Sequence, residues 1–332
     1  MRFLFSILPV VAFLLALKSL DSYKLVRFKA ILLSLMVGFF VALAGFIINR
    51  SIMSASGIET ISYSRYFAPV VEEFLKTLYL CYLIHSKKIG FMVDAAIFGF
   101  AIGAGFAIIE NSYYLINLTG TNPLVIIIRG FGTAIMHGGT TAIFGIITRS
   151  LYDRFDASIL KSYLPGFVIA VIIHSLFNHF FISPVATTLS IIIILPILMS
   201  IVFKQSEKSL AGWLGVGFDA DAELLEMITS GTILDTHIGK YLLSLKDRFP
   251  GEIVADMLCL LQIHLELSIR AKGILLMKEA GFSAPPDPEI EEKFEEFRYL
   301  KNSIGSTGML AMHPLLRWGS RELWQLNMIE KQ

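Results

Sequence analysis

Long apolar runs, separated by short polar joints, fill the first 203 residues of the chain. A helix needs about 20 apolar residues to cross the hydrocarbon core of a bilayer. By this measure the pattern predicts membrane-spanning helices at residues 3–17, 29–49, 67–85, 91–118, 123–148, 164–182 and 185–203. Beyond residue 203 charged and apolar residues mix as they do in soluble proteins, so we expect a soluble helical region over residues 204–332.

The first apolar run follows Met1 and Arg2, and in this respect it resembles a secretory signal peptide. Such a peptide ends at a cleavage site flanked by small residues. No such site precedes Lys18. We therefore interpret residues 3–17 as a short first span.

Positive charge in the joints predicts the orientation, because cytoplasmic loops are enriched in Lys and Arg. The joints at 18–28, 86–90 and 149–163 are basic, and so is the start of the tail. The joints at 119–122 and 183–184 carry no Lys or Arg. This alternation predicts an N-terminus outside the cell and a C-terminal tail in the cytoplasm.

The composition agrees with this pattern. The chain is 55% hydrophobic and 17% charged, whereas soluble domains carry about 25% charged residues. A net charge of +1 gives no reason to expect a nucleic-acid partner. Cys81 and Cys259 lie far apart, so we expect neither a disulfide framework nor a thiolate metal site. The predicted fold is an all-α, multi-pass bundle in the cell membrane, followed by the cytoplasmic helical region.

Ionisable residues within four of these spans suggest a functional site, because charge inside a bilayer is costly and usually serves a function. The clusters contain Glu72, Glu73 and Lys76, then Glu110 and Asn111, then His137, and finally His174 and Asn178. At a rise of about 1.5 Å per residue, their principal groups lie at matching depths, roughly 8–12 Å below the outer surface. We therefore expect them to converge in the outer leaflet.

The spacing within the clusters suggests different roles for neighbouring residues. Glu72 and Glu73 are adjacent, so their side chains diverge by about 100° around the helix. Lys76 lies within ion-pair reach of either glutamate, and we expect one of them to neutralise it. The other is free for chemistry, and the spacing leaves open which one it is. His174 and Asn178 are four residues apart and share a helix face.

Hydrolysis of a peptide bond is a reaction that such a set could catalyse. Neither a Ser/His/Asp nor a Cys/His arrangement is evident at this depth, so the expected nucleophile is water, with a buried glutamate as its general base. A carboxylate and two imidazoles are also suitable ligands for zinc, and the expected set is Glu110, His137 and His174. The chain contains no His-Glu-x-x-His run, so activation of water by a carboxylate is better supported than a metal site.

A stripe of small residues follows one face of the fourth predicted span. It consists of Ala95, Gly99, Gly103 and Ala107, spaced four residues apart. Such a stripe lets another helix approach closely. The stripe predicts a tight bundle that keeps lipid away from the polar clusters.

At the polar clusters the sequence resembles the PrsW family of intramembrane proteases, which is related to the CAAX prenyl protease and Aph-1 group. The resemblance covers roughly residues 65–182 and rests on four short motifs on successive spans. These are Glu72-Glu73-x-x-Lys76, Phe106-x-x-x-Glu110-Asn111, Met136-His137-Gly138 and His174-x-x-x-Asn178. CAAX-type proteases carry Glu-Glu-x-x-x-Arg and a His at the position of Glu110, so Lys76 and Glu110 favour the PrsW side.

The resemblance implies a membrane-embedded metalloprotease. The family's glutamate pair maps to Glu72 and Glu73, and its histidines map to His137 and His174. Family members cut membrane-anchored anti-sigma factors on the outer side of the membrane. The predicted catalytic residues are Glu72, Glu73, Glu110, His137, His174 and Asn178.

Two other functions remain open at this stage. An Aph-1-like scaffold would use the same polar residues to hold partner helices, and a proton-coupled transporter would use them as a proton relay. The expected partners of a protease are the lipid bilayer and a membrane-anchored protein substrate. In the tail, apolar periodicity predicts a long helix over residues 251–279, and we expect the tail either to bind a cytoplasmic partner or to be a plain structural extension.

Overall fold

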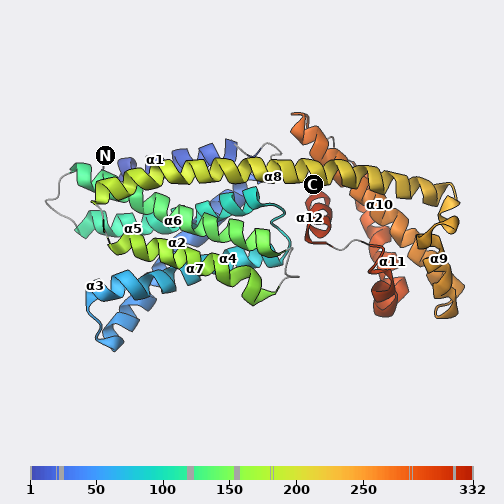
Figure 1. Ribbon diagram of the computed structural model, residues 1–332, viewed down its shortest axis with the longest axis horizontal. Helices are drawn as coiled ribbons and strands as arrows, with labels where there is room; N and C mark the ends of the chain where they lie inside the picture. The colour runs from blue at the N-terminus through green and yellow to red at the C-terminus, as the bar shows by residue number, and fades with distance from the viewer. Residues whose placement is uncertain are drawn as a thin grey trace. The chain divides into compact units, whose positions relative to one another are not determined.

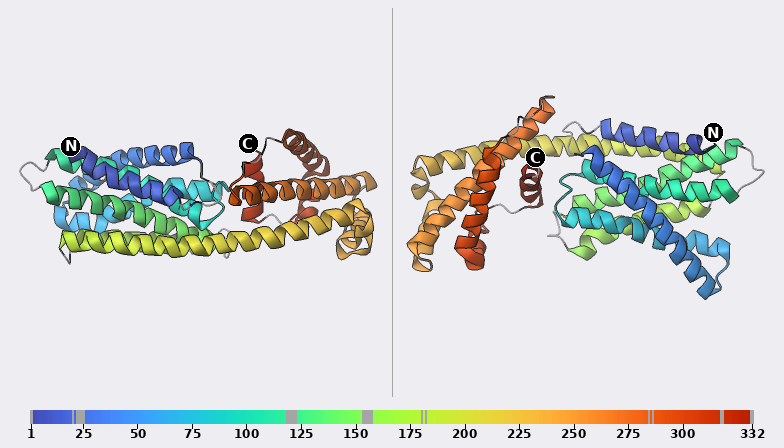
Figure 2. Two further views of the ribbon diagram at one scale, coloured as in Figure 1. Left: turned by 90° about the horizontal axis from the view of Figure 1, so that it is seen from above. Right: turned by 180° about the vertical axis from the view of Figure 1, so that it is seen from behind.

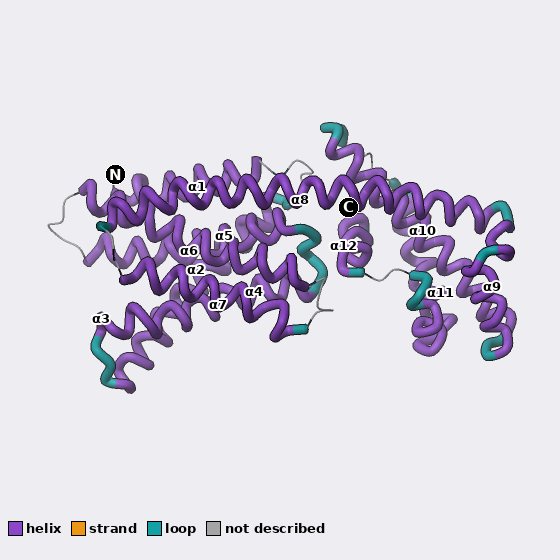
Figure 3. Tube along the Cα trace, viewed as in Figure 1, coloured by secondary structure: helices purple, strands orange, loops and turns teal. Residues whose placement is uncertain are grey.

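The computed structural model describes residues 2–19, 21, 26–117, 123–152, 158–179, 181, 183–283, 285, 287–316 and 319–330. Over these residues every regular element is a helix (Figure 3), as the all-α prediction requires. The chain divides into two compact units, Met1–Glu207 and Lys208–Gln332.

The first unit is a helix bundle (Figure 1). Its elements are α1 (Arg2–Ser19), α2 (Phe28–Ser56), α3 (Thr60–Ser62), a π-helical turn (Tyr63–Phe67), α4 (Ala68–His85), α5 (Met92–Asn117), α6 (Pro123–Tyr152), α7 (Ile159–His179) and the first part of α8 (Pro184–Thr229).

Within the described part of the chain, five helices are long and apolar enough to cross a membrane, namely α2, α5, α6, α7 and α8. The length and apolar composition of these helices identify the chain as a membrane protein. The other two predicted spans correspond to α1 and α4, each 18 residues long. α4 is less apolar than the five because it carries Glu72, Glu73 and Lys76. A count of seven spans, and their orientation, remain predictions.

α8 differs from its prediction in length. The expected span ended at residue 203, but the helix continues without a break to Thr229. Residues 204–229 contain no proline, and Ala, Leu and Glu, which propagate a helix well, outnumber the three glycines in this stretch. The apolar pattern ends at residue 203, where the predicted span ends, but the helical backbone hydrogen bonds continue to Thr229. The predicted boundary between spans and tail therefore falls inside a helix.

α5 and α6 form the centre of the bundle, and most of their residues are buried. They pack closely because of the small-residue stripe on α5. A Cβ atom added at Gly99 would lie 2.6 Å from the carbonyl oxygen of Thr141, and one at Gly103 would lie 2.1 Å from that of His137. The predicted close packing is confirmed, and the α6 segment that carries His137 is held against α5.

The other helices surround this pair, as the two views of Figure 2 show. α2 packs on α5, α7 packs on α6, and α4 contacts α2, α5, α6 and α7. Because α4 touches four helices, its side chains can reach groups from several spans. This arrangement brings the predicted polar clusters together.

The second unit contains the rest of α8, a 3-10 turn (Thr232–Asp235), α9 (His237–Ser244), a second 3-10 turn (Leu245–Asp247), α10 (Gly251–Glu279), α11 (Glu289–Met312) and α12 (Ser320–Ile329). The predicted helix over residues 251–279 is confirmed as α10. It ends before Gly281, whose φ of 84° is left-handed and suits glycine. Apolar residues of α10, α11 and α12 form the core of this unit.

Candidate active site

α4 carries both glutamates of the site. Glu73 and Lys76 are fully buried, and the Lys76 ammonium lies 2.5 Å from Glu73 Oε1. Glu72, one residue earlier, points away from this ion pair because successive helical side chains diverge, and it faces the other ring nitrogen of His174. The structure therefore shows that Glu73 is the glutamate that neutralises Lys76.

Oε1 of Glu73 is the centre of a hydrogen-bond network. Besides Lys76, it lies 2.7 Å from His174 Nδ1 on α7 and 3.2 Å from Thr140 Oγ1 on α6. A carboxylate only accepts hydrogen bonds, so Lys76 and His174 donate to this oxygen. The single hydroxyl proton of Thr140 is shared between it and the carbonyl oxygen of His137, 3.1 Å away. Glu73 therefore links α4, α6 and α7, and it holds the His174 ring with Nδ1 protonated.

His137 on α6 bridges two charged groups. Its Nδ1 lies 3.0 Å from Lys76 Nζ, and its Nε2 lies 2.5 Å from Glu110 Oε2 on α5. An ammonium group can only donate, so in this network Nδ1 accepts a hydrogen bond and Nε2 carries the proton. The Nε2–H group of His137 therefore donates a hydrogen bond to Glu110 Oε2.

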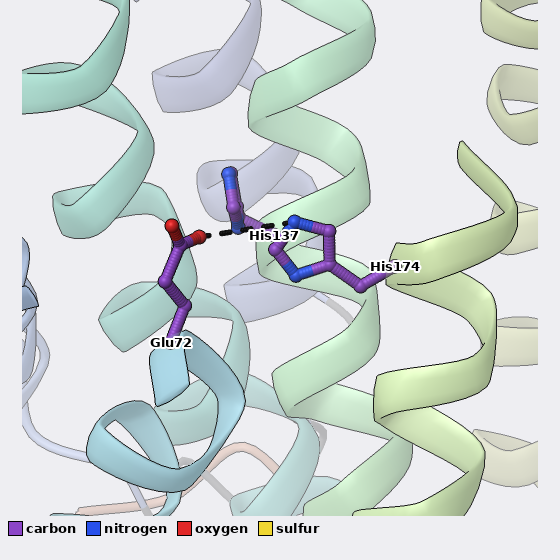
Figure 4. A group of neighbouring side chains, drawn as sticks. All are labelled: Glu72, His137 and His174. Carbon is purple, nitrogen blue, oxygen red and sulfur yellow. Dashed lines mark ion pairs between the residues drawn. The ribbon is translucent and has the colours of Figure 1, made fainter. Parts of the chain in front are cut away.

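Glu72, His137 and His174 face one another from α4, α6 and α7 (Figure 4). Glu72 Oε2 lies 3.8 Å from His174 Nε2. Nδ1 of His174 is bound to Glu73, so Nε2 is the ring nitrogen that faces Glu72. At 3.8 Å the two groups approach each other without a direct hydrogen bond.

A cavity of about 750 Å³ opens onto these groups. Among the predicted site residues, Glu72, Glu110, His174 and Asn178 line it. Its remaining lining is mainly apolar and aromatic, and includes Phe106, Ile109, Met136 and Phe177. Glu73 is absent from this lining and fully buried. Of the two adjacent glutamates, Glu72 is the one that borders the cavity.

The two asparagines of the predicted motifs contact the backbone of the bundle. Asn178 Nδ2 donates to the carbonyl of Ser64 at 2.9 Å, and Asn111 Nδ2 donates to that of Gly130 at 2.8 Å. Asn178 therefore ties α7 to the π-helical turn, which contains Ser64. Its predicted catalytic role remains a prediction.

One group of side chains could hold a metal ion. Ligand atoms of Glu72, His137 and His174 all lie within 4.8 Å of one another. This set has Glu72 where the sequence predicted Glu110, which instead contacts His137. One carboxylate and two histidines form a set that binds zinc in proteins, and the contact of His174 with Glu73 is the outer contact that such a ligand needs.

His137 is less well prepared to bind a metal. Its Nε2 carries the proton in this network, and its Nδ1 faces the Lys76 ammonium. A ring nitrogen must offer a lone pair to bind a metal. The donor set thus fits zinc in composition, but His137 must first lose its Nε2 proton.

Three contacts of the network were missed by the sequence analysis. Thr140 donates to Glu73, Asn49 donates to Glu72, and Tyr63 donates to Asn49. Asn49 and Arg50 end an apolar run, so they looked like an ordinary membrane interface. Tyr63 fell in a predicted joint. The available signal was a polar residue at the end of the apolar run that precedes, along the chain, the run with Glu72.

The fold and the site define a class: a bundle of apolar helices that encloses carboxylates and imidazoles around a cavity, as an intramembrane hydrolase requires. A family model described as PrsW family intramembrane metalloprotease matches residues 26–202, which is more than half of the 332-residue chain. The chain belongs to this family, as the four motifs predicted. Neither a curated protein nor a solved structure matches the chain.

Proposed function

We propose that this protein is a cell-membrane protease that hydrolyses a peptide bond of a membrane-anchored protein. One observation carries the proposal: Glu72 borders the cavity beside His174, while the adjacent Glu73 is occupied by Lys76. Family membership supports the activity. The family resemblance suggests a signalling protein such as an anti-sigma factor as the substrate.

In the proposed reaction Glu72 is the general base. It takes a proton from a water molecule, and the water oxygen attacks the carbonyl carbon of the scissile bond. When the C–N bond breaks, Glu72 returns the proton to the leaving nitrogen. His174 accepts the second hydrogen bond of the water through Nε2, because its Nδ1 is bound to Glu73.

The oxyanion of the tetrahedral intermediate needs hydrogen-bond donors and positive charge. His137 supplies an N–H group at Nε2, which in the resting network is bound to Glu110. Lys76 lies behind the same ring, 3.0 Å from its Nδ1, and donates a hydrogen bond to that nitrogen, which keeps the ring proton on Nε2. We therefore assign stabilisation of the oxyanion to His137, with Glu110 as the group that releases it.

Zinc is the metal that this donor set would take, and Glu72, His137 and His174 would hold it. When bound, such an ion polarises a carbonyl and lowers the pKa of bound water. In that case Glu72 would be a ligand, and Glu110 would be the remaining carboxylate at the cavity able to act as base.

The proposed topology has seven spans, with α1 and α4 completing the five apolar helices. The N-terminus lies outside and the tail lies in the cytoplasm. A fluorescent protein that folds only in the cytoplasm, fused after Gln332, should fluoresce, and the same protein fused before Met1 should not. The reverse pattern would overturn the orientation.

The activity can be tested without a known substrate. Membranes from cells that express the wild type or Glu72→Gln at equal levels are treated with a reagent that labels new peptide N-termini. We expect a set of N-termini, inside or just outside transmembrane segments, that appears only with the wild type. Glu59→Gln is the matched control, because Glu59 is an exposed glutamate outside the site.

Identical N-termini with the wild type and Glu72→Gln would overturn the proteolytic function. If Glu72→Gln instead lost a co-purifying membrane protein, the Aph-1-like scaffold would replace it. The role of a metal is tested by chelation of the purified protein. Cleavage that survives chelation supports Glu72 as base without a metal. Cleavage lost and then restored by zinc supports a bound metal, and loss of zinc binding in Glu72→Gln would then make Glu72 a ligand.

A further inference from the structure

The cavity wall formed by α2 carries a side chain that touches the proposed base. The C-terminal half of α2 contributes Ala42, Leu43, Phe46, Asn49, Arg50 and Met53 to the lining of the cavity. Asn49 Nδ2 lies 3.0 Å from Glu72 Oε1. The wall and the base are therefore linked by a hydrogen bond between two helices.

A second hydrogen bond sets the direction of the first. The buried hydroxyl of Tyr63, in the π-helical turn before α4, donates to Asn49 Oδ1 at 3.0 Å. A carboxylate cannot donate, so the amide must present its NH₂ group to Glu72 and its oxygen to Tyr63. Tyr63, Asn49 and Glu72 thus form a directed chain of hydrogen bonds.

This chain distinguishes the two oxygens of Glu72. Oε1 is bound to Asn49, and Oε2 faces His174 Nε2 at 3.8 Å. A glutamate side chain has several rotatable bonds, and fixing it costs conformational entropy. The bond from Asn49 holds the carboxylate in the orientation that presents Oε2 to the site of the proposed water.

α2 meets α5 most closely at one crossing point, which lies away from Asn49. A Cβ atom at Gly38 would lie 1.9 Å from the carbonyl oxygen of Ile102, so the two backbones touch there. At Gly45 the nearest atom across the interface is a ring carbon of Phe106 at 3.6 Å. The two backbones are thus separated by side chains near Asn49. Glu72 and Tyr63 are the polar partners of Asn49 in this region.

We propose that Asn49 is a positioning residue for Glu72 and that Tyr63 holds Asn49 in place. This inference rests on the proposed function, in which Glu72 activates water. Asn49 acts through Glu72 and not on the substrate, so its loss lowers kcat more than it raises KM. Tyr63 acts through Asn49, so its effect disappears when Asn49 is gone.

The test uses the full chain in proteoliposomes and a synthetic peptide that spans a bond cleaved only by the wild type in the membrane labelling experiment. Loss of one hydrogen bond to a charged group lowers a rate by about 10- to 100-fold. We expect Asn49→Leu to lower kcat by that factor and to change KM by less than about 3-fold. Tyr63→Phe alone should lower kcat about 3- to 10-fold, as expected for a neutral hydrogen bond.

Two further variants separate positioning from packing. Asn49→Asp keeps the shape of the side chain but replaces the donor with an acceptor, so it should lose at least as much activity as Asn49→Leu. Tyr63→Phe should cause no further loss in the Asn49→Leu background, because residues of one network are not additive. Ser51→Ala on α2 and Tyr66→Phe in the π-helical turn are matched controls that should match the wild type.

Near-wild-type kcat in Asn49→Asp would overturn the proposal, and so would independent, additive effects of Asn49→Leu and Tyr63→Phe. Tyr63→Phe removes a single oxygen atom, so it tests the chain of hydrogen bonds even if the Asn49 variants fail to fold. Failure of the proposed function looks different, because the wild type itself would then cleave nothing.

Discussion

Both units of the protein bury a lysine against a carboxylate, and the direct contacts of the two pairs are alike. Lys76 and Glu73 in the membrane unit, and Lys272 and Asp221 in the tail, are each separated by 2.5 Å. In each pair the bonded carboxylate oxygen also accepts a hydrogen bond from a hydroxyl group. Each ammonium also lies over an aromatic ring, at 5.2 Å from the centroid for Lys76 and 5.4 Å for Lys272.

The difference lies in what surrounds the two pairs. In the membrane unit, Lys76 and Glu73 each contact an imidazole, and two more carboxylates, Glu72 and Glu110, border the cavity. The tail pair also borders a cavity, of about 370 Å³, with His264 and Glu322 in its lining. There the carboxylate of Glu322 accepts a hydrogen bond from the indole of Trp213. The Ser268 hydroxyl donates a hydrogen bond to Asp221 and accepts one from the side-chain amide of Gln325.

A buried ion pair therefore does not by itself indicate catalysis. Burying charge is costly unless it is paired and hydrogen-bonded, and both units meet that condition. In the membrane unit the ion pair also orients His137 and His174. These histidines lie beside Glu72, a carboxylate that is not part of the pair. Four experiments test this distinction, and each can use a probe specific to one unit.

The two units carry separate natural probes. All three tryptophans, Trp213, Trp318 and Trp324, belong to the tail, so intrinsic fluorescence reports its unfolding. Cys81 is partly buried in the membrane unit, and Cys259 is exposed in the tail. In a Cys259→Ala background, the reaction of Cys81 with a thiol dye therefore reports unfolding of the membrane unit.

The largest effect is expected at the two adjacent glutamates. Glu72→Gln should lower cleavage by about 100- to 10,000-fold, the contribution of a general base, with little change in unfolding measured at Cys81. Glu73→Gln should lower both the cleavage rate and the stability of the membrane unit, because an unpaired buried Lys76 costs about 3–5 kcal/mol. Equal loss of stability in both variants would remove the division of roles between these neighbours.

Replacing either ion pair with apolar residues should have a similar effect on the stability of its unit but a different effect on cleavage. Lys272→Met should destabilise the tail by about 3–5 kcal/mol, and the double variant Asp221→Leu/Lys272→Met should recover most of that loss. Its cleavage activity should remain within about 2-fold of the wild type. The counterpart Glu73→Leu/Lys76→Met should also recover stability but should stay inactive, because His137 and His174 lose their partners. An active counterpart would contradict an orienting role for the pair.

A smaller, pH-dependent effect is expected in the tail. Burial lowers the pKa of His264 to about 4 from its usual value of 6.5, with Asp221 opposing and Lys272 adding to the shift. The unfolded state then binds the proton more tightly, so the contribution of neutral His264 is complete above pH 6.5 and is lost progressively as the pH falls toward 4. The expected loss is about 3 kcal/mol.

Tryptophan fluorescence during urea unfolding, measured across that pH range, checks this loss. The pH dependence assigned to His264 should be missing from His264→Leu. If the variant keeps the same dependence, another group is responsible. Cleavage measured at constant pH should be similar in both proteins, because His264 belongs to the tail.

The smallest effect is expected at Thr140. Thr140→Val keeps the shape of the side chain and removes one of the three donors to Glu73 Oε1. Loss of one such bond costs about 1 kcal/mol, so we expect a decrease in cleavage of about 3- to 10-fold and a small decrease in stability. Ser268→Ala should affect only the fluorescence transition of the tail. A change in cleavage with Ser268→Ala would show that the two networks are coupled.

Much of the fold followed from the apolar pattern. Each apolar run predicted by the sequence contains a helix, and α10 has the predicted bounds. The packing of α5 on α6 followed from its small-residue stripe. These features depend on local periodicity and side-chain size, which can be read along the chain. The end of the last span was less predictable, because α8 continues as a helix after its residues cease to be apolar.

Which residues can meet in the bundle follows from the sequence alone, because their depths and types follow from span positions and motifs. Which of those residues pair with one another depends on the tertiary structure. It paired Glu73 with Lys76, left Glu72 facing the cavity, placed Glu110 against His137, and brought Asn49 from α2 to Glu72. These choices depend on the rotation of each helix about its axis and on its distance from its neighbours. Both are set by packing between distant segments, because each helix satisfies its own backbone hydrogen bonds at any rotation.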